Sequence, residues 1–545
     1  MSGARGSEER VSGGREREDG ARAVSLVCEG CGAVPPPLAR APYPFRCERA
    51  GRAGEGAIDH VVAPRLVGGA AVWPRGDEAR PFVKYRRVLH AHAAAIELGL
   101  GDEGYLAIVE RLDRAIERVD GRSFCATPLV RSAALGEAVG LGGEVWIKDE
   151  TRNVSGSHKG RHLFGVLVHL ELVRAAGLEV SPPPSLAIAS CGNAALAAAV
   201  LARAAERQLA VMVPPDAHPR VLARLRELGA DVQVCARSAP GSGAGGGSIV
   251  TDGARDEGHG AAGVNVAAGD PTVAAFRRAV AAGALPFACQ GTECGLTLDG
   301  GKTLGFEVID AGVPFDRAFV QVGGGALASS FARAFDDARA LGVIERRPRL
   351  MTVQTEAVAP LARAYDRLVG EVRARLAGGA AMEAARSAGG QFLQILSTAP
   401  TRAGDPGERA VPSWGEPRGG DALADVLRAP GIGEVTARVL GEMAHDRAAW
   451  LPPWPAPRSS AAHGILDDET YDALAILRAM VASGGWPIVV DEATVLEAEA
   501  KGREATGIDV DATGTAGLAG LLAWSRRPDA ARGERVAALF TGARR

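Results

Sequence analysis

Residues 144–161 read EVWIKDETRNVSGSHKGR, and this stretch decides the fold. The apolar run EVWIK (144–148) predicts a strand, and the residues from about 158 onward predict a helix. A polar loop rich in Gly, Ser and Asn joins them, as is typical of a connection between two such elements. A strand, a loop and a helix in this order indicate the start of an α/β arrangement.

The same alternation continues along the chain. A helix is predicted from about Asn193 and another up to about Leu228, with Gly229 as its C-terminal cap, while residues 84–118 are predicted to be helical. Strands that alternate with helices indicate a parallel sheet covered by helices, so we expect an α/β fold with parallel or mixed sheets. The further predicted strands are SLAIAS (185–190), LAVMVP (209–214), DVQVC (231–235), RAFVQV (317–322) and RLMTVQ (349–354).

Composition argues against several classes of protein. The net charge of -3 gives no reason to expect nucleic acid or an anionic membrane surface as a partner. No apolar run approaches the ~20 residues of a membrane helix. Eight cysteines are scattered through a chain with no signal peptide, which is typical of a reducing compartment. We therefore expect a cytoplasmic protein.

Lysine-based chemistry has only five candidates, because arginine is strongly preferred in this sequence. Lys159 stands at the predicted helix start, where the positive end of the helix dipole favours a neutral amine. A neutral amine can attack an aldehyde to form a Schiff base. Lys148 is followed directly by two acidic residues, and Lys501 lies in a charged helix. Lys159 is thus the candidate nucleophile, with an ordinary surface lysine as the alternative.

A second loop, SCGN (190–193), also joins a strand to a helix. Its backbone N–H groups could bind an anion at the helix start, and Asn193 could donate to a phenolate oxygen. The alternative is that Asn193 only caps the helix.

A third loop, GGGALAS (323–329), has the composition of a phosphate cradle. Three glycines allow close approach of the backbone to an anion, and the following helix supplies N–H groups and its dipole. The spacing also satisfies the glycine pattern of a dinucleotide site, so an NAD(P)-binding oxidoreductase is an alternative. That interpretation needs an acidic residue at the end of the next strand, which ends instead at Gln354.

A lysine for a Schiff base, a donor at a helix start and a phosphate cradle together describe pyridoxal 5'-phosphate. The chain resembles the fold type II pyridoxal-phosphate enzymes, the tryptophan synthase β superfamily, with its blocks in the order seen in threonine synthase. The resemblance covers roughly residues 126–350 and 485–545. Its blocks are TPLV (127–130), IKDETRNVSGSHK (147–159), SCGN (190–193), GGKTLGFEV (300–308), QVGGGALAS (321–329) and FTG (540–542).

The resemblance implies a two-lobed enzyme with roles for particular residues. Lys159 would carry the cofactor and shuttle the proton at the substrate Cα, beside His158. Asn193 would bind the cofactor O3′, and Thr541 would face the pyridine nitrogen, which favours elimination or replacement at Cβ or Cγ. A homodimer acting on a small amino acid is expected. The phosphate would bind the backbone of Gly323, Gly324, Gly325, Ala326 and Leu327.

The sequence also departs from both named activities. Gly160 follows the lysine where threonine synthases have Asp, and DATGTA (511–516) replaces their usual EPSGA. Tryptophan synthase β would show Glu in the loop that reads SCGN here. A non-catalytic or regulatory homologue that binds the cofactor is therefore the alternative to a lyase.

Three cysteines near the N-terminus, Cys28, Cys31 and Cys47, resemble the zinc ribbon of many threonine synthases. A structural zinc needs four ligands, and Ala50 stands near the place of the fourth cysteine. His60 could complete the set. A metal-free relic of the ribbon is the alternative, which the missing cysteine favours.

We expect six segments along the chain. Within the fifth, residues 400–462 are expected to be irregular. Ser459, Ser460, His463 and Asp467 could reach the substrate, but a solvated helix start is the favoured interpretation. The segments are a disordered tail (1–24), a degenerate zinc-ribbon-like module (25–63), a helical segment (64–125), the catalytic core (126–356), an insertion with Pro/Gly-rich loops (357–484) and the C-terminal part of the core (485–545).

Overall fold

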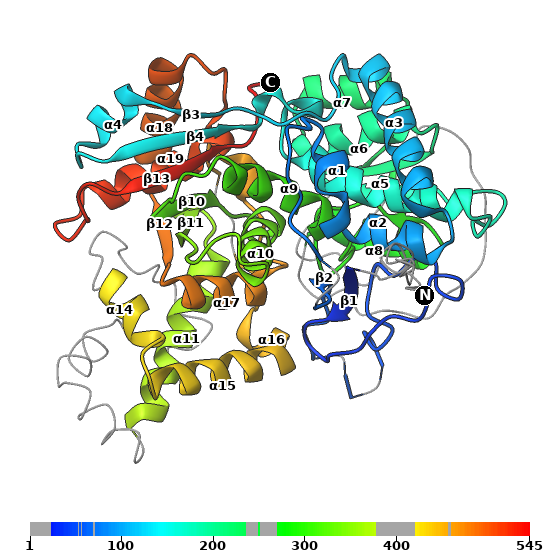
Figure 1. Ribbon diagram of the computed structural model, residues 1–545. Coiled ribbons are helices and arrows are strands. Elements are labelled where there is room, and N and C mark those ends of the chain that lie inside the picture. The colour runs from blue at the N-terminus through cyan, green and yellow to red at the C-terminus, as the bar shows by residue number, and fades with distance from the viewer. Residues whose placement is uncertain are drawn as a thin grey trace, which may run out of the picture.

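Two α/β lobes lie side by side in the computed structural model (Figure 1). The structure describes residues 23–52, 54–55, 57–68, 71–235, 249–250, 270–377, 420–455 and 459–545. The predicted tail (1–24) lies almost entirely outside the described residues, as does most of the Gly/Ser-rich stretch 240–262. The expected α/β class is confirmed.

The first lobe is built on a six-stranded mixed sheet with the order β12-β11-β10-β13-β4-β3. All neighbours are parallel except β3, which pairs antiparallel with β4 at the edge. The buried apolar run of each central strand explains its place inside the sheet, because such strands are covered on both faces. The strands are β3 (Leu129–Arg131), β4 (Glu144–Asp149), β10 (Arg317–Gln321), β11 (Arg349–Thr355), β12 (Pro487–Val490) and β13 (Arg535–Phe540).

The second lobe carries a five-stranded sheet with the order β8-β7-β6-β5-β9. The pairs among β5, β6, β7 and β9 are parallel, and β8 is antiparallel. The strands predicted from SLAIAS, LAVMVP and DVQVC all form here. The strands are β5 (Leu186–Ala189), β6 (Leu209–Val213), β7 (Asp231–Cys235), β8 (Ile249–Val250) and β9 (Leu285–Pro286).

Helices flank both sheets. In the first lobe α19 packs against β10 to β13, while α10, α11 and α17 contact β10 to β12; in the second, α6, α7 and α8 cover β5 to β7. The core helices are α4 (Ala133–Val139), α5 (Lys159–Ala175), α6 (Asn193–Ala204), α7 (Pro219–Glu227), α8 (Pro271–Ala281), α9 (Thr297–Asp310), α10 (Ala326–Ala340), α11 (Pro360–Ala377), α17 (Ala473–Ser483), α18 (Glu492–Thr506) and α19 (Ala512–Ser525).

The helical stretch predicted over residues 84–118 is correct in type but broken into pieces. Gly99 and Gly101 have φ angles of 75° and 68°, which no continuous helix permits. These glycines separate α2 (His90–Glu97) from α3 (Gly101–Asp120). The break between α1 (Pro81–Lys84) and α2 lies at Leu89, whose backbone is extended with φ -105° and ψ 141°.

The N-terminal module contributes a two-stranded antiparallel sheet, β1 (Val24–Cys28) and β2 (Val62–Leu66). The expectation of irregular structure over 400–462 is wrong where that region is described. Leu423, Val426 and Leu427 recur at helical spacing and are buried, as is typical of an amphipathic helix. The helices are α14 (Gly420–Leu427), α15 (Ile432–His445) and α16 (Arg447–Trp450).

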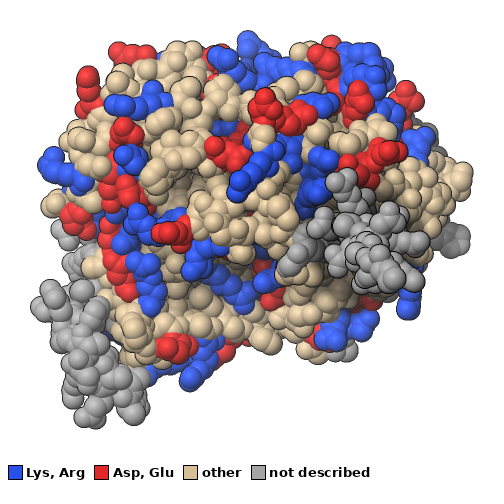
Figure 2. Space-filling model, viewed as in Figure 1, with Lys and Arg blue, Asp and Glu red and all other residues tan. Residues whose placement is uncertain are grey.

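The surface carries charges of both signs. On the viewed face, Lys and Arg side chains are interspersed with Asp and Glu (Figure 2). Within the described ranges, none of the helices combines the length and the apolar character needed to cross a membrane.

Candidate active site

The loops that carry the predicted site residues lie at the carboxyl ends of parallel strands. Adjacent strands β4, β13 and β10 lead into the loop before Lys159, into Thr541 and into Gly323, respectively. Strand β5 of the other lobe leads into the loop that ends at Asn193. Ligands in open α/β folds bind beyond such strand ends. The fold therefore directs all four loops toward the space between the lobes.

Lys159 differs from every other lysine in its electrostatic surroundings. It is half-buried at the first turn of α5, and it has no ion pair or hydrogen bond with a described residue. The other four lysines are paired with carboxylates. Those pairs are Lys84 with Asp310 at 2.5 Å, Lys148 with Glu307 at 2.5 Å, Lys302 with Asp337 at 3.1 Å and Lys501 with Glu497 at 3.0 Å.

A lysine held by a carboxylate stays protonated and cannot act as a nucleophile. The side chain of Lys302 illustrates this, because its two acidic partners raise the amine pKa against the effect of burial. Within the described part of the chain, only Lys159 keeps an amine that is free to condense with an aldehyde.

His158 lies buried next to Lys159 and is tied to the C-terminal segment. Its Nδ1 is 3.1 Å from the carbonyl oxygen of Thr541, which requires a proton on Nδ1 and leaves Nε2 as an acceptor. Burial, together with the neighbouring Lys159 ammonium, lowers the pKa of His158 well below its ordinary value. The imidazole is therefore neutral and is available as an acceptor or proton relay.

Thr541 is buried, so it is not a frayed terminal residue. Its hydroxyl oxygen accepts a hydrogen bond from Gln321 Nε2 at 2.7 Å. The same amide nitrogen is within hydrogen-bond distance of the carbonyl oxygens of Thr513, Gly514 and Leu539, which fixes its orientation. Because Thr541 accepts from Gln321, its own hydrogen is left to be donated elsewhere.

Asn193 does not cap helix α6, since Gly192 occupies the cap position and the helix has no side-chain cap bond. Its Oδ1 instead accepts from Arg545 Nη2 at 3.1 Å. The Nδ2 group lies against Gly542, where an added methyl group would be only 2.5 Å away. Asn193 is thus brought against Gly542, the residue that follows Thr541, although it lies at the other end of the catalytic core in the sequence.

Cys191, in the same loop, is not activated. Burial raises the pKa of its thiol, which favours the protonated, unreactive form. Cys191 is therefore a small residue that packs in the loop rather than a nucleophile.

The glycine loop turns tightly between β10 and α10. Gly325 has a φ of 104°, a conformation that other residues rarely adopt. Ala326 and Leu327 begin the buried first turn of α10. The N–H groups of this turn have no helical partner, as an anion-binding loop requires.

Asp467 lies on this loop, contrary to the interpretation of residues 459–467 as a solvated helix start. Its carboxylate lies against the loop, since a methyl group added at Gly323 would be only 2.3 Å from Asp467 Oδ2. Burial raises the pKa of Asp467 to about 6, and the Lys159 ammonium opposes that rise. Lys159 and the glycine loop are therefore on the same side of the molecule. The Ser460 hydroxyl accepts from the Ala462 N–H, and His463 Nδ1 is 3.1 Å from the Ala461 carbonyl oxygen.

A fully buried network of ion pairs holds the first turn of α5 in place. Arg161 donates to Glu150 at 2.8 Å and is also paired with Glu307 at 2.5 Å. Lys148 and Thr127 complete the network through Glu307 and Glu150. The network fixes the turn that carries Lys159, because Arg161 lies in that same turn of α5.

These residues fit an aldehyde cofactor with an anionic group. The Asp467 carboxylate stands in for a phosphate oxygen at the glycine loop, and Lys159 supplies the free amine. The buried Ser157 hydroxyl has no partner among the described side chains and backbone groups, so it can bind a further polar atom. The fold and this site define a class of two-lobed α/β enzymes that hold an anionic cofactor between the lobes.

The family assignment rests on the sequence match. The model of the family described as pyridoxal-phosphate dependent enzyme matches residues 123–399, half of the chain. The chain belongs to this family, and pyridoxal phosphate is the cofactor that the family implies. Comparison with curated proteins gives no match.

Solved structures of similar architecture include racemases and lyases. Maize serine racemase is 15% identical at a TM-score of 0.48, covering 80% of this chain and 93% of its own. The threonine deaminase of T.th. is 19% identical with a TM-score of 0.46, and the match covers 80% of this chain and 98% of that structure. Diaminopropionate ammonia lyase from Escherichia coli is 11% identical with a TM-score of 0.46, and the match covers 80% of this chain and 88% of that structure. We infer no reaction from these likenesses.

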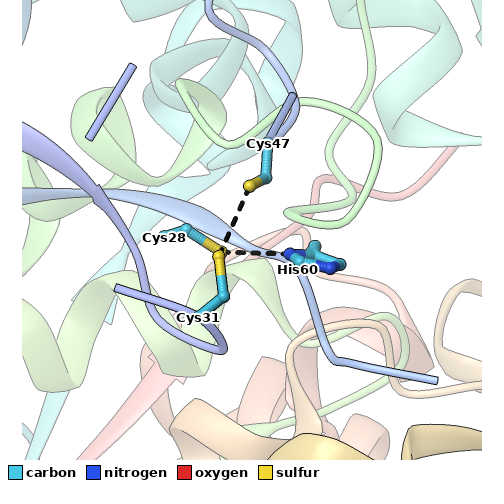
Figure 3. Close-up of side chains that lie close together, drawn as sticks. All are labelled: Cys28, Cys31, Cys47 and His60. Carbon is cyan, nitrogen blue, oxygen red and sulfur yellow. Dashed lines mark hydrogen bonds between the residues drawn. The ribbon is translucent and has the colours of Figure 1, made fainter. Parts of the chain in front are cut away.

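The N-terminal module brings its four predicted metal ligands together (Figure 3). The ligand atoms of Cys28, Cys31, Cys47 and His60 all lie within 4.8 Å of one another. Cys31 and Cys47 Sγ are 3.6 Å apart, and Cys28 Sγ is 3.5 Å from His60 Nδ1. Tetrahedral zinc places its ligand atoms about 3.5–3.8 Å apart.

The surroundings of the four ligand side chains also suit a metal. His60 Nε2 is 3.3 Å from the carbonyl oxygen of Glu55, which leaves the Nδ1 lone pair directed at the cysteines. Three of the four side chains are buried. The cluster therefore has the donor set and the shape of a structural zinc site.

Local sequence patterns indicated no role for two residues of the candidate site, and they did not predict where a third, Asp467, would lie. Gln321 orients Thr541, Arg545 orients Asn193, and Asp467 occupies the glycine loop. Asp467 was noticed in a polar segment, but its contact with the loop has no local signal.

Proposed function

We propose that this chain catalyses elimination or replacement at Cβ or Cγ of a small amino acid, with pyridoxal phosphate attached to Lys159. The observation that carries the proposal is the amine of Lys159, the one described lysine without a carboxylate partner, on the same side as the glycine loop. When bound, the cofactor withdraws electrons from the substrate Cα.

The protein residues then supply binding and proton transfer. The Lys159 amine takes the Cα proton, and the N–H groups of Gly323 to Leu327 bind the phosphate. The Asn193 Nδ2 donates to the phenolate oxygen. The neutral His158 accepts or relays a proton through Nε2, because its Nδ1 is occupied by the Thr541 carbonyl.

The choice of elimination over transamination is supported by Thr541. Its hydroxyl accepts from Gln321 and is left to donate, so it stabilises an unprotonated pyridine nitrogen. A hydroxyl at the position of Thr541 would therefore favour loss of a Cβ or Cγ substituent over transamination.

Borohydride trapping tests the attachment site. Purified protein loaded with pyridoxal phosphate is reduced, digested and mapped by mass spectrometry. We expect the pyridoxyl group on the peptide that contains Lys159. A label on Lys302 or Lys148, or a protein that takes up no cofactor, would contradict the proposal.

A panel of single amino acids then separates a lyase from a non-catalytic homologue. For a lyase, at least one amino acid changes the visible spectrum and releases ammonia or a Cβ or Cγ substituent. An unchanged spectrum and no product across the whole panel would favour the binding protein.

We also propose that Cys28, Cys31, Cys47 and His60 bind a structural zinc ion. The convergence of four ligand atoms within 4.8 Å supports this over a metal-free relic. The ion would hold the module against the core, where Asp59, next to His60, is paired with Arg447 at 2.8 Å.

Metal analysis of the purified protein is expected to give about one zinc per chain. Because ligand sets of this kind fold with their metal, Cys28→Ser should release the zinc and lower the melting temperature by several degrees. Cys125→Ser, which removes an exposed cysteine far from the cluster in sequence, is the matched control. Metal-free wild-type protein with the same melting temperature as zinc-loaded protein would rule out the site.

A further inference from the structure

The glycine loop is covered by a segment of the chain itself, residues 463–472, which we call the covering segment. A methyl group added at Gly323 would lie 2.3 Å from Asp467 Oδ2 and 2.9 Å from the Ile465 Cα. At Gly324 it would lie 3.0 Å from the ring of Tyr471. The covering segment thus fills the space directly above the loop.

Hydrogen bonds hold the covering segment in this place. The Thr470 hydroxyl donates to the Gly323 carbonyl at 3.1 Å, and the Asp472 N–H donates to the Gly324 carbonyl at 3.2 Å. The Gly324 N–H also acts to lower the pKa of the Asp467 carboxyl, which lies against the loop. The segment therefore occupies two carbonyl acceptors of the loop and places a carboxylate beside one of its N–H donors.

Two anchors fix the ends of the covering segment. The Arg447 guanidinium, on α16, donates to the carbonyl oxygens of Tyr471 at 3.1 Å and Thr470 at 3.3 Å. The Gly464 N–H donates to the Thr513 hydroxyl at 3.0 Å. The part that faces the loop, including Asp467, lies between these anchors.

A phosphate and the Asp467 carboxylate cannot share the loop. Both need the same N–H groups, and two anions at that distance repel each other. The oxygen atoms of Asp467 occupy the place where phosphate oxygens would bind.

We propose that the covering segment is an internal competitor for the anion site, and that an anionic ligand binds only after Asp467 withdraws from the glycine loop. This goes beyond the proposed function, on which it rests only for the identity of the anion as the phosphate of the cofactor. The chain therefore alternates between a closed form, with the carboxylate on the loop, and an open form that accepts phosphate.

A reversible disulfide tests the need for opening. A Cβ atom built on Gly464 lies 3.5 Å from the Thr513 Cβ, within the range of about 3.5–4.5 Å for a disulfide. Gly464→Cys combined with Thr513→Cys should therefore lock the covering segment when oxidised. We expect the oxidised protein to take up no pyridoxal phosphate and the reduced protein to take it up.

Wild type and each single variant, carried through the same oxidation, control for the native cysteines and for the substitutions. Equal uptake by the oxidised and reduced double variant would overturn the proposal.

Asp467→Ala tests the competition directly, with inorganic phosphate as the probe. Removal of the carboxylate frees the Gly324 N–H and removes a negative charge, so we expect calorimetry to show a Kd for phosphate about tenfold lower than in wild type. Asp468→Ala removes the same charge one residue away and should leave the Kd within about twofold. An Asp467→Ala Kd no lower than that of wild type would refute the competition.

The two proposals can fail separately. If borohydride trapping fails at Lys159 but Asp467→Ala binds phosphate more tightly, the competitor stands and the attachment site is wrong. If trapping labels Lys159 in wild type and the oxidised double variant still takes up pyridoxal phosphate, as followed by visible absorbance without reductant, the attachment site stands and the competitor is wrong.

Discussion

Lys159→Ala is expected to abolish covalent binding of pyridoxal phosphate and to lower kcat by about 10⁴-fold or more. The magnitude follows because the variant loses the Schiff base and also the group that moves the Cα proton, and a general base alone contributes about 10²–10⁴-fold. The other four lysines cannot substitute, since each is paired with a carboxylate. The measurements are the visible absorbance of the loaded protein and turnover of any amino acid that wild type converts.

Lys501→Ala is the matched control for this prediction. Lys501 lies on α18 in an i,i+4 pair with Glu497, and its loss should leave both readouts unchanged. A Lys159→Ala protein that keeps the absorbance band and the turnover of wild type would show that another group binds the aldehyde.

Arg161→Met is expected to reduce the free energy of unfolding by about 3–5 kcal/mol. It leaves Glu150 and Glu307 buried with only Lys148 to balance them, and breaking one partner of a buried ion pair costs about this amount. Urea denaturation of the apoprotein measures the effect. Borohydride trapping in the same variant should also weaken, because Arg161 lies one half-turn after Lys159 and fixes that turn.

An ion pair with an exposed arginine provides the control for Arg161→Met. Arg111, whose side chain is 52% exposed, donates to the buried Glu171 at 2.8 Å. Glu171 keeps Arg207 at 2.9 Å when Arg111 is removed, so Arg111→Met should cost no more than about 1 kcal/mol. Equal losses in the two variants would contradict the importance of the buried network.

The pH dependence of the Arg161 effect follows from Glu150. Burial acts to raise the pKa of Glu150, but the Arg161 and Lys148 charges outweigh it and lower the pKa from 4.5 to about 2. A carboxyl with a depressed pKa contributes stability that is fully present above the unfolded value and is lost as pH falls through the folded value. The difference between wild type and Arg161→Met should therefore be constant above pH 4.5 and shrink toward pH 2.

Local sequence patterns were sufficient for the elements that frame the site. The strand at 144–148, the helix that begins at Lys159 and the turn of Gly323 to Gly325 form where they were predicted. Apolar runs and the conformational freedom of glycine act over a few residues, so a single sequence reveals them. The break at Gly99 and Gly101 was missed, because a short gap barely changes the apolar periodicity.

Local sequence patterns could not predict which residues, distant along the chain, contact one another in the folded protein. The sequence nominated His60 as a metal ligand, but only the pairing of β1 with β2 brings it to Cys28. The sequence suggested that Lys159 is special, but the reason, the carboxylates bound to the other lysines, emerges only after distant helices pack together.

The sequence by itself determined the α/β class, the expected cofactor and the local structure around Lys159. Each of these depends on residues that lie close together along the chain. Only the tertiary structure decided that Asp467 lies on the glycine loop, that Gln321 orients Thr541 and that Arg545 orients Asn193. Charges and hydrogen-bond donors act through space over a few ångströms, and residues more than a hundred positions apart become neighbours only when the two lobes have folded.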